Sequence, residues 1–257
     1  MLRRDGCAIG RLNTGKWAKY NILLQDKLLA PHLPDTNLFH KESLADFLNK
    51  YKTVVIKPSG GSGGTNLIKV STGANGRFII HVDNTAFTAN GLHALHSYIQ
   101  RLKKKEKVYL IQQYIPLARV NNRPFDIRIM VQRRPNSPWR VTGGLAKVAG
   151  PGYVVTNVKH SGGRVLPLQT AINQSTLKQL GNEFSLIKLS WLAIRTAKRL
   201  SEVYPTERTI GIDMGVDTNG QIWIIEANFR PAASLFLKLK NKQMYRNIIT
   251  YRRRYAP

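Results

Sequence analysis

The chain has 257 residues and carries 40 lysine and arginine residues against 14 aspartate and glutamate residues, a formal net charge of +26. No apolar run reaches the length of about 18 residues that a membrane span needs, and the N-terminal residues lack the apolar core of a secretory signal. Cys7 is the only cysteine, which excludes an internal disulfide and a cysteine-based zinc site. We therefore expect a cytoplasmic protein. The chain length predicts one large domain or two packed lobes.

The basic surface has two interpretations. In the first, a surface of this charge attracts anions such as nucleic acid, nucleotides, anionic polymers or acidic membranes. In the second, the surface is simply solvated and has no dedicated partner. Because acidic residues are scarce, their positions are informative. Asp213, Asp217 and Glu226 fall within one short stretch near the C-terminus, and this clustering calls for a chemical reason.

The first half of the chain is predicted to mix helices and strands. Trp17, Tyr20, Leu24 and Leu28 recur at helical spacing before Pro31. Helices are expected over residues 14–30, 41–50 and 91–104. Strands are expected over residues 53–57, 67–70, 77–82 and 108–115.

The second half is predicted to contain strands around one long helix. Strands are expected over residues 125–132, 139–147, 209–216 and 221–227. Helices are expected over residues 182–204 and, as a basic tail, 235–254. The order of elements predicts an α+β fold, a single domain in which lobe one (about 14–112) and lobe two (about 113–257) meet near residues 112–116.

A glycine loop follows the strand that ends near Lys57. Small residues let backbone N–H groups approach and bind a phosphate, and Lys57 would add a cation beside them. The loop lacks the lysine and the helix that follow the glycines of a Walker A motif. It is instead predicted to be a flap between two strands that can fold over a nucleotide. A flexible hairpin tip without a ligand is the alternative. The loop residues are Gly60, Gly61, Ser62, Gly63 and Gly64.

The acidic cluster lies on a predicted hairpin. Asn219-Gly220 is a strong signal for a two-residue turn, and counting back from it places Asp213 opposite Glu226, with Asn228 on the same face. Three oxygen-bearing side chains on one face suit Mg²⁺. The alternative is a solvent-facing hairpin with acids by chance, but its apolar alternation argues for burial. Asp217, beside the turn, is expected to be structural.

Five segments in this order resemble an ATP-grasp domain. They are most similar to the YheC/YheD family of endospore coat-associated ATP-grasp proteins, with RimK-type amino-acid ligases as more distant relatives. The resemblance runs from about Lys16 to Pro231. The segments are residues 54–58 with the glycine loop, 112–115, 125–128, Asn157 with 161–163, and 211–228.

The resemblance implies ATP and Mg²⁺ as cofactors and an ATP-grasp fold whose lobes grip the nucleotide. Lys57 and, more loosely, Lys16 would contact the phosphates together with the glycine loop. Arg128 would face the γ-phosphate or an acyl-phosphate. The remaining nucleotide contacts would come from Gln113 and Tyr114 at the adenine, Asp126 at the ribose, and Lys147. Asp213, Glu226 and Asn228 would hold Mg²⁺, with Asn157 nearby.

Three functions remain open. The first is an ATP-dependent ligase that joins an unknown carboxylate to an amine or thiol through an acyl-phosphate. The second is a catalytically inactive, nucleotide-binding structural protein associated with the spore coat. It is motivated by the short segment before the first helix, where related ligases carry a substrate-binding domain. The third is a basic nucleic-acid or polyanion binder, which the charge supports although no RNA-binding signature, zinc finger or clear recognition helix does.

Overall fold

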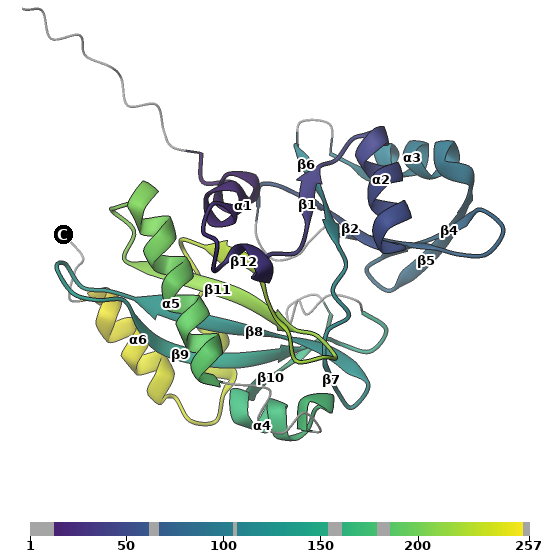
Figure 1. The fold of residues 1–257 in the computed structure, drawn as a ribbon. Coiled ribbons are helices and arrows are strands. Elements are labelled where there is room, and N and C mark those ends of the chain that lie inside the picture. The colour runs from purple at the N-terminus through teal and green to yellow at the C-terminus, as the bar shows by residue number, and fades with distance from the viewer. Residues whose placement is uncertain (1–12, 62–66, 105–106, 154–160, 179–185, 254–257) are drawn as a thin grey trace, which may run out of the picture.

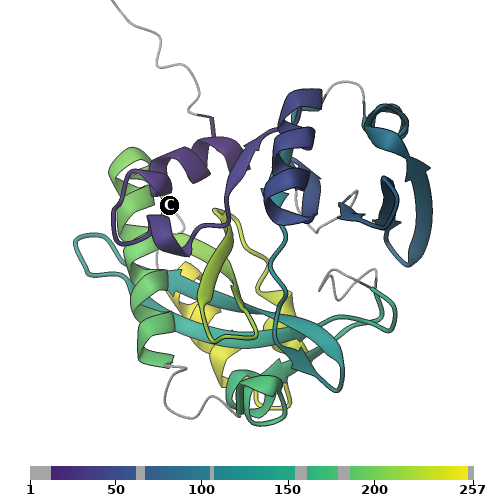
Figure 2. The ribbon, with the colours of Figure 1, turned by 45° about the vertical axis from the view of Figure 1, so that its right-hand side comes forward.

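The computed structural model describes residues 13–61, 67–104, 107–153, 161–178 and 186–253. These residues form two antiparallel sheets with helices packed on them (Figures 1 and 2), so the predicted α+β class is confirmed. Ser62, Gly63, Gly64 and Asn157 lie outside the described residues. Within the described part of the chain, no helix is long and apolar enough to cross a membrane.

The first sheet, at the upper right of Figure 1, is covered by two helices. Its strand order is β1-β6-β2-β3-β4-β5. The strands are β1 (Thr36–Leu38), β6 (Tyr109–Gln113), β2 (Thr53–Pro58), β3 (Ile68–Thr72), β4 (Arg77–Val82) and β5 (Thr85–Asn90). Helices α2 (Lys41–Tyr51) and α3 (Gly91–Leu102) bury Leu44 and Leu95 in one core with Ile56. Strands β1 and β5 were not predicted.

The second sheet has the strand order β10-β9-β8-β11-β12. Its strands are β10 (Arg164–Pro167), β9 (Arg140–Val148), β8 (Arg123–Gln132), β11 (Thr209–Val216) and β12 (Ile222–Asn228), and the short β7 (Arg119–Val120) pairs with β8. β10 and the short helix α4 (Leu168–Asn173) that follows it were not predicted.

Helices cover both faces of the second sheet. Helix α5 (Leu186–Val203) packs on the face to which Ile127 and Ile129 of β8 point. Helix α6 (Gln243–Arg253) packs on the other face, where Met130 of β8 contacts Ile248. Successive residues of a strand point to opposite faces, so the buried β8 carries apolar residues on both sides.

The long helix α5 agrees with its predicted core face. Leu189, Ala193, Ala197 and Leu200 are buried, as is Tyr204 just after the helix, whereas Leu186 at the start is 38% exposed. The described helix begins at Leu186 and ends at Val203, and residues 182–185 lie outside the described part of the chain.

The first helix is shorter than predicted and packs elsewhere. Helix α1 (Lys16–Leu24) ends where Asp26 accepts hydrogen bonds from the backbone of the following turn, and the 3₁₀ helix η1 (Ala30–His32) comes next. Leu24 and Leu28 of the predicted apolar face are 45% and 52% exposed. Leu23 enters the core of the second sheet instead, together with Leu29 and Leu33. Residues 14–33 therefore pack with lobe two, whereas the sequence predicts lobe one to begin at about residue 14.

The basic tail is not one helix. A 3₁₀ helix, η3 (Ser234–Lys238), precedes α6, and both lie on the second sheet. Phe236 and Ile248 are fully buried against Met130 and Leu145. The tail thus forms part of the core, because its apolar residues cover a sheet face that the other helices leave open.

The hairpin β11–β12 has the predicted register near Asp213, although its turn differs from the predicted one. Asp213 pairs with Glu226, and Gly211 pairs with Asn228. The turn, however, spans three residues between Asp217 and Gln221, with Gly220 at φ +83°. The extra turn residue is offset by a bulge, since Asp213 faces Glu226 while Met214 faces Ile224.

The bulge at Ile225 decides which way Glu226 points. Ile222 and Ile224 point into the α5 core, so an unbroken strand would turn Glu226 into the same core. The extra residue reverses the alternation, and Ala227 enters the core in its place. Glu226 and Asn228 are thereby directed to the opposite face.

Candidate functional site

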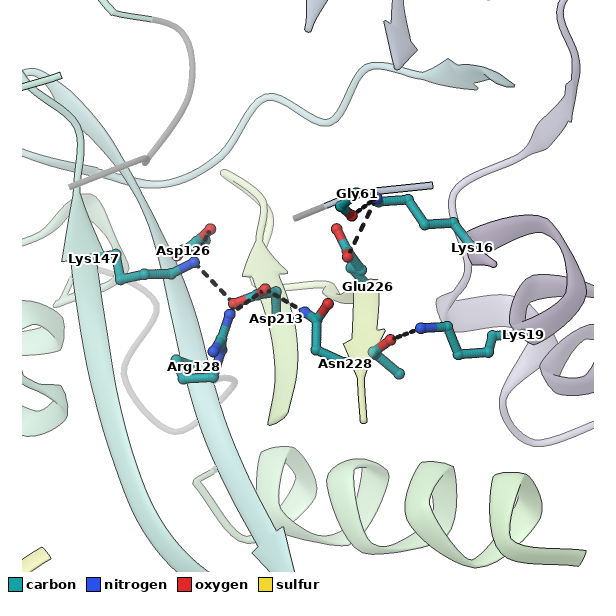
Figure 3. A network of polar contacts seen from close by, with 10 residues as sticks. Lys16, Lys19, Gly61, Asp126, Arg128, Lys147, Asp213, Glu226 and Asn228 are labelled. Carbon is teal, nitrogen blue, oxygen red and sulfur yellow. Dashed lines mark hydrogen bonds and ion pairs between the residues drawn. The ribbon is translucent and has the colours of Figure 1, made fainter. Parts of the chain in front are cut away.

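The candidate site lies where α1 and the first sheet meet the middle strands of the second sheet. Figure 3 shows Asp213 at its centre, with side chains from β8 and β9 on one side and from β12 and α1 on the other. Neighbouring strands supply the central groups, because Asp213 pairs with Arg128 on one side and with Glu226 on the other.

Asp213 accepts four hydrogen bonds. Arg128 donates from Nε to Oδ1 at 2.8 Å and from Nη2 to Oδ2 at 2.7 Å. Lys147 Nζ donates to Oδ1 at 2.8 Å, and Asn228 Nδ2 donates to Oδ2 at 3.2 Å. A carboxylate has about four lone-pair positions, so this arrangement uses all of them.

The charges of this cluster stabilise one another. Burial alone would raise the pKa of Asp213, but the Arg128 and Lys147 cations outweigh it and hold that pKa well below its usual range. Burial would likewise lower the pKa of Lys147, yet Asp126 at 3.1 Å and Asp213 raise it. Asp213 and Lys147 are therefore both charged near neutral pH.

A second group of charges faces the first from α1 and β2. Lys16 Nζ lies 3.6 Å from Glu226 Oε1 and donates to the backbone oxygen of Gly61 at 2.7 Å. This contact ties the start of the glycine loop to α1. Gly61 has φ +88°, while Gly60 is exposed with open space around it.

Lys57 is buried at the end of β2. Its Nζ donates to Gln112 Oε1 at 2.8 Å. Burial lowers the pKa of Lys57 to about 8. A cavity of about 30 Å³ adjoins it, roughly the volume of one water molecule. Its lining includes Lys16, Lys57, Gln112 and Glu226.

Lys19 was not predicted to belong to the site. Its buried ammonium donates to the backbone oxygen of Ala227 and lies 4.9 Å from the ring centre of Phe229. It thus holds α1 against β12, beside Glu226 (Figure 3). The three-residue step from Lys16 to Lys19 puts both on one helix face, and this spacing was the available signal.

Gln113 and Tyr114 lie where the chain leaves the first sheet. Gln113 exchanges backbone and side-chain hydrogen bonds with Asp35, at 2.8 and 3.4 Å. The ammonium of Lys69 lies over the ring of Tyr114, 4.4 Å from the ring centre. These contacts, with Asp35 and Lys69, place Gln113 and Tyr114 apart from the cluster around Asp213.

The site carries an excess of positive charge. In the part of the chain that the structure describes, the site brings five basic side chains together with three carboxylates, those of Asp126, Asp213 and Glu226. The basic residues are Lys16, Lys19, Lys57, Arg128 and Lys147. A ligand with several negative charges would balance this excess.

The donor atoms of these residues suit a magnesium ion, provided that Asp213 can release one of its present hydrogen-bond donors. Glu226 and Asn228 supply hard oxygen donors next to Asp213, as Mg²⁺ prefers. Asp213, however, is fully occupied by donors and could bind a metal only if one of them moved. Among the described residues no group of three or more His, Cys, Asp and Glu side chains could hold a metal, so Asn228 is essential to this donor set.

Asp217 is structural, as predicted. Its Oδ1 accepts from the backbone of Asn219 and Gln221, and its Oδ2 accepts from Trp223 Nε1 at 2.9 Å. The carboxylate therefore closes the turn of the β11–β12 hairpin and is not directed into the site.

Comparisons with known proteins agree with this geometry. A family model described as YheC/D-like ATP-grasp matches residues 8–257. The endospore coat-associated proteins YheD and YheC of Bacillus subtilis (strain 168) are 29% and 23% identical, over 86% and 91% of this chain. The chain spans only 49% of YheD and 64% of YheC.

Solved structures share the fold at low identity. D-cycloserine synthetase DcsG is 10% identical with a TM-score of 0.55, covering 93% of this chain and 69% of that one. The ATP-grasp ligase PsnB, complexed with minimal precursor, is 12% identical with a TM-score of 0.54, covering 93% of this chain and 60% of that one. The expected ATP-grasp fold is therefore confirmed.

Proposed function

Because this chain belongs to the YheC/D-like ATP-grasp family, we propose that it binds ATP with Mg²⁺ and acts as a ligase. The proposed reaction joins a carboxylate to an amine or a thiol through an acyl-phosphate. The observation that carries the proposal is the cluster around Asp213, in which groups of four neighbouring strands and α1 bring an excess of cations onto one face.

The proposed roles are those that the family resemblance implies, and the positions and charges of Lys16, Lys57 and Arg128 support them. Lys16 and Lys57 flank the glycine loop and would neutralise nucleotide phosphates. Arg128 would stabilise the phosphoryl group as it passes to the carboxylate, because its guanidinium is always charged and donates in a fork. Gln113 and Tyr114 would hold the adenine, and Asp126 and Lys147 would lie near the ribose and phosphates.

The bond changes of the proposed reaction need little covalent chemistry from the protein. A carboxylate oxygen attacks the γ-phosphorus and ADP leaves. The amine or thiol then attacks the acyl carbon, displaces phosphate and loses its proton. Bound Mg²⁺, held by Asp213, Glu226 and Asn228, would supply charge neutralisation at the phosphates. The side chains contribute positioning and electrostatic stabilisation.

The first test is calorimetric titration of ATP with and without Mg²⁺. We expect Mg²⁺-dependent binding that falls at least about tenfold in Asp213→Asn and Glu226→Gln, a loss of about 1.4 kcal/mol or more. A screen of carboxylates with amines or thiols should then release ADP, and Glu226→Gln should abolish that release.

The matched control is Glu202→Gln. Glu202 is an exposed carboxylate on α5, paired with Arg199, and its replacement should leave ATP binding unchanged. Equal ATP binding by Glu226→Gln and Glu202→Gln would contradict the proposed metal site. Failure of the wild type to bind ATP under any condition would overturn the proposed function.

A nucleotide-binding protein without turnover is the second candidate. It is favoured because the relatives YheD and YheC are named endospore coat-associated proteins. In that case ATP binding should be retained while no carboxylate and amine pair raises ADP release. Substrate-dependent ADP formation would rule this candidate out.

A further inference from the structure

Lys57 has a neutral hydrogen-bond partner although it is buried. Its side chain lies on the face of β2 opposite to the one that packs Ile56 into the apolar core, with 8% of the residue exposed. Its ammonium donates to the amide oxygen of Gln112 at 2.8 Å. Buried charges are usually paired with an opposite charge. The direct partner here is an amide, which accepts a hydrogen bond but cancels no charge.

A chain of hydrogen bonds across three adjacent strands sets the direction of that amide. Gln112 Nε2 donates to Thr36 Oγ1 at 2.7 Å, and the Thr36 hydroxyl donates to the backbone oxygen of Pro34 at 2.8 Å. Because the hydroxyl hydrogen is used on Pro34, Thr36 can only accept from Gln112. The amide nitrogen must therefore face Thr36, and its oxygen must face Lys57.

Strand order makes this chain of contacts possible. β1, β6 and β2 are neighbours, and the register aligns Thr36 with Gln112 and Gln112 with Val55. Lys57 lies one step along the same face of β2. The amide occupies one of the three ammonium donors, and the cavity that Lys57 shares with Lys16 and Glu226 adjoins that ammonium.

We propose that Gln112, oriented by Thr36, is a positioning residue that aims the Lys57 ammonium at the nucleotide phosphates without neutralising its charge. The inference rests on the proposed nucleotide binding. A carboxylate at position 112 would hold Lys57 equally well but would cancel the charge that a phosphate needs, so the amide combines fixed direction with full charge.

The surroundings of Lys57 predict a pH dependence. Burial lowers the pKa of Lys57 to about 8, while Glu226 on β12 and Asp213 on β11 raise it and Lys16 on α1 lowers it further. Lys19 also faces the cavity from α1. As the pH rises through about 8, Lys57 loses its proton, and phosphate affinity should fall with it.

The test measures Mg²⁺-ATP affinity of the full chain by calorimetry between about pH 6 and 10, together with adenosine binding. In Thr36→Val the amide loses its fixed direction, and we expect ATP affinity to fall about 3- to 10-fold while adenosine affinity stays the same. Thr36→Ser restores the hydroxyl and should recover most of the loss. Gln112→Glu should weaken ATP binding and shift the pH at which affinity falls upward by about one unit or more.

A matched control exists on the second sheet. Thr142 Oγ1 donates to Gln132 Oε1 at 2.5 Å, far along β8 and β9 from the site. Thr142→Val removes a comparable threonine–glutamine contact and should leave the affinity and its pH profile unchanged. Wild-type affinity and pH profile in both Thr36→Val and Gln112→Glu would overturn the proposal.

A second measurement separates this inference from the proposed function. NMR titration of lysine residues labelled at the ε-carbon, with Lys57→Met to assign the signal, follows Lys57 without nucleotide. We expect a midpoint near 8 in the wild type and a higher one in Gln112→Glu. If the wild type fails to bind ATP but the midpoints differ in this way, the proposed function is wrong. The effect of Gln112 on the charge of Lys57 is then still supported. Equal midpoints would overturn the positioning role.

Discussion

At the scale of single residues, Asp213 is the point on which the site depends. Its carboxylate is buried and receives a bidentate guanidinium, an ammonium and an amide. Desolvation of such a group is costly and is offset only while its partners are present. Asp213 therefore serves folding and the proposed chemistry through the same contacts.

Replacing Arg128 tests the folding role. Among the described residues, Arg128→Ala leaves Lys147 as the cation that pairs with Asp213. We expect the free energy of unfolding, measured by urea denaturation, to fall by about 3 kcal/mol. Lys50→Ala is the control, because Lys50 and Asp35 form an exposed pair with 65% and 40% of their side chains accessible, and it should cost less than about 1 kcal/mol. A loss for Arg128→Ala no larger than the control would show that the buried pair adds no stability.

At the scale of elements, the C-terminal segment is built into the second sheet. Gly143 of β9 leaves room for it, since a Cβ at that position would lie 2.8 Å from Phe236 Cε1 and 3.0 Å from Ile248 Cδ1. The apolar contacts hold η3 and α6, while their basic side chains such as Lys238 and Arg246 stay exposed. The segment is thus a structural element with a basic outer face.

Gly143→Ala should displace this segment. We expect a loss of about 1–3 kcal/mol in unfolding free energy, typical of overpacking, measured by denaturant unfolding and by increased protease cleavage after residue 233. Gly60→Ala is the matched control, because a Cβ there meets nothing within 4 Å. Unchanged stability and cleavage in Gly143→Ala would mean that the segment does not need this contact.

At the scale of the whole molecule, the charge of +26 and the site compete as explanations for anion binding. Nucleotide held in the site contacts both sheets through Lys57 and the Asp213 cluster, as proposed, and should stabilise the whole fold. Non-specific attraction to a basic surface depends on counterion release and weakens steeply with salt.

Thermal unfolding in the presence of ligand separates the two. Mg²⁺-ATP at about 100 times its dissociation constant should add about 2.7 kcal/mol of stability. The gain should persist at high salt, and at the same ATP concentration it should fall to about 1.4 kcal/mol or less in Glu226→Gln. An inorganic polyphosphate should stabilise both proteins alike and only at low salt. Equal, salt-sensitive shifts from both ligands would favour the polyanion binder.

Most strands, the apolar face of α5 and the pairing of Asp213 with Glu226 are predictable from the order of the residues alone. These features depend on local periodicity and on a turn close by in the chain. Even there two local details were wrong, because the three-residue turn and the bulge at Ile225 cancel in the register.

The contacts that form the site depend on the three-dimensional packing of distant segments. Arg128 and Asp213 are 85 positions apart, Lys57 and Gln112 are 55 apart, and Lys19 reaches the backbone of Ala227 from 208 positions away. Periodicity carries no information on which surfaces meet at such separations. The packing of α1 on the second sheet and the full occupation of Asp213 follow from how the two sheets come together.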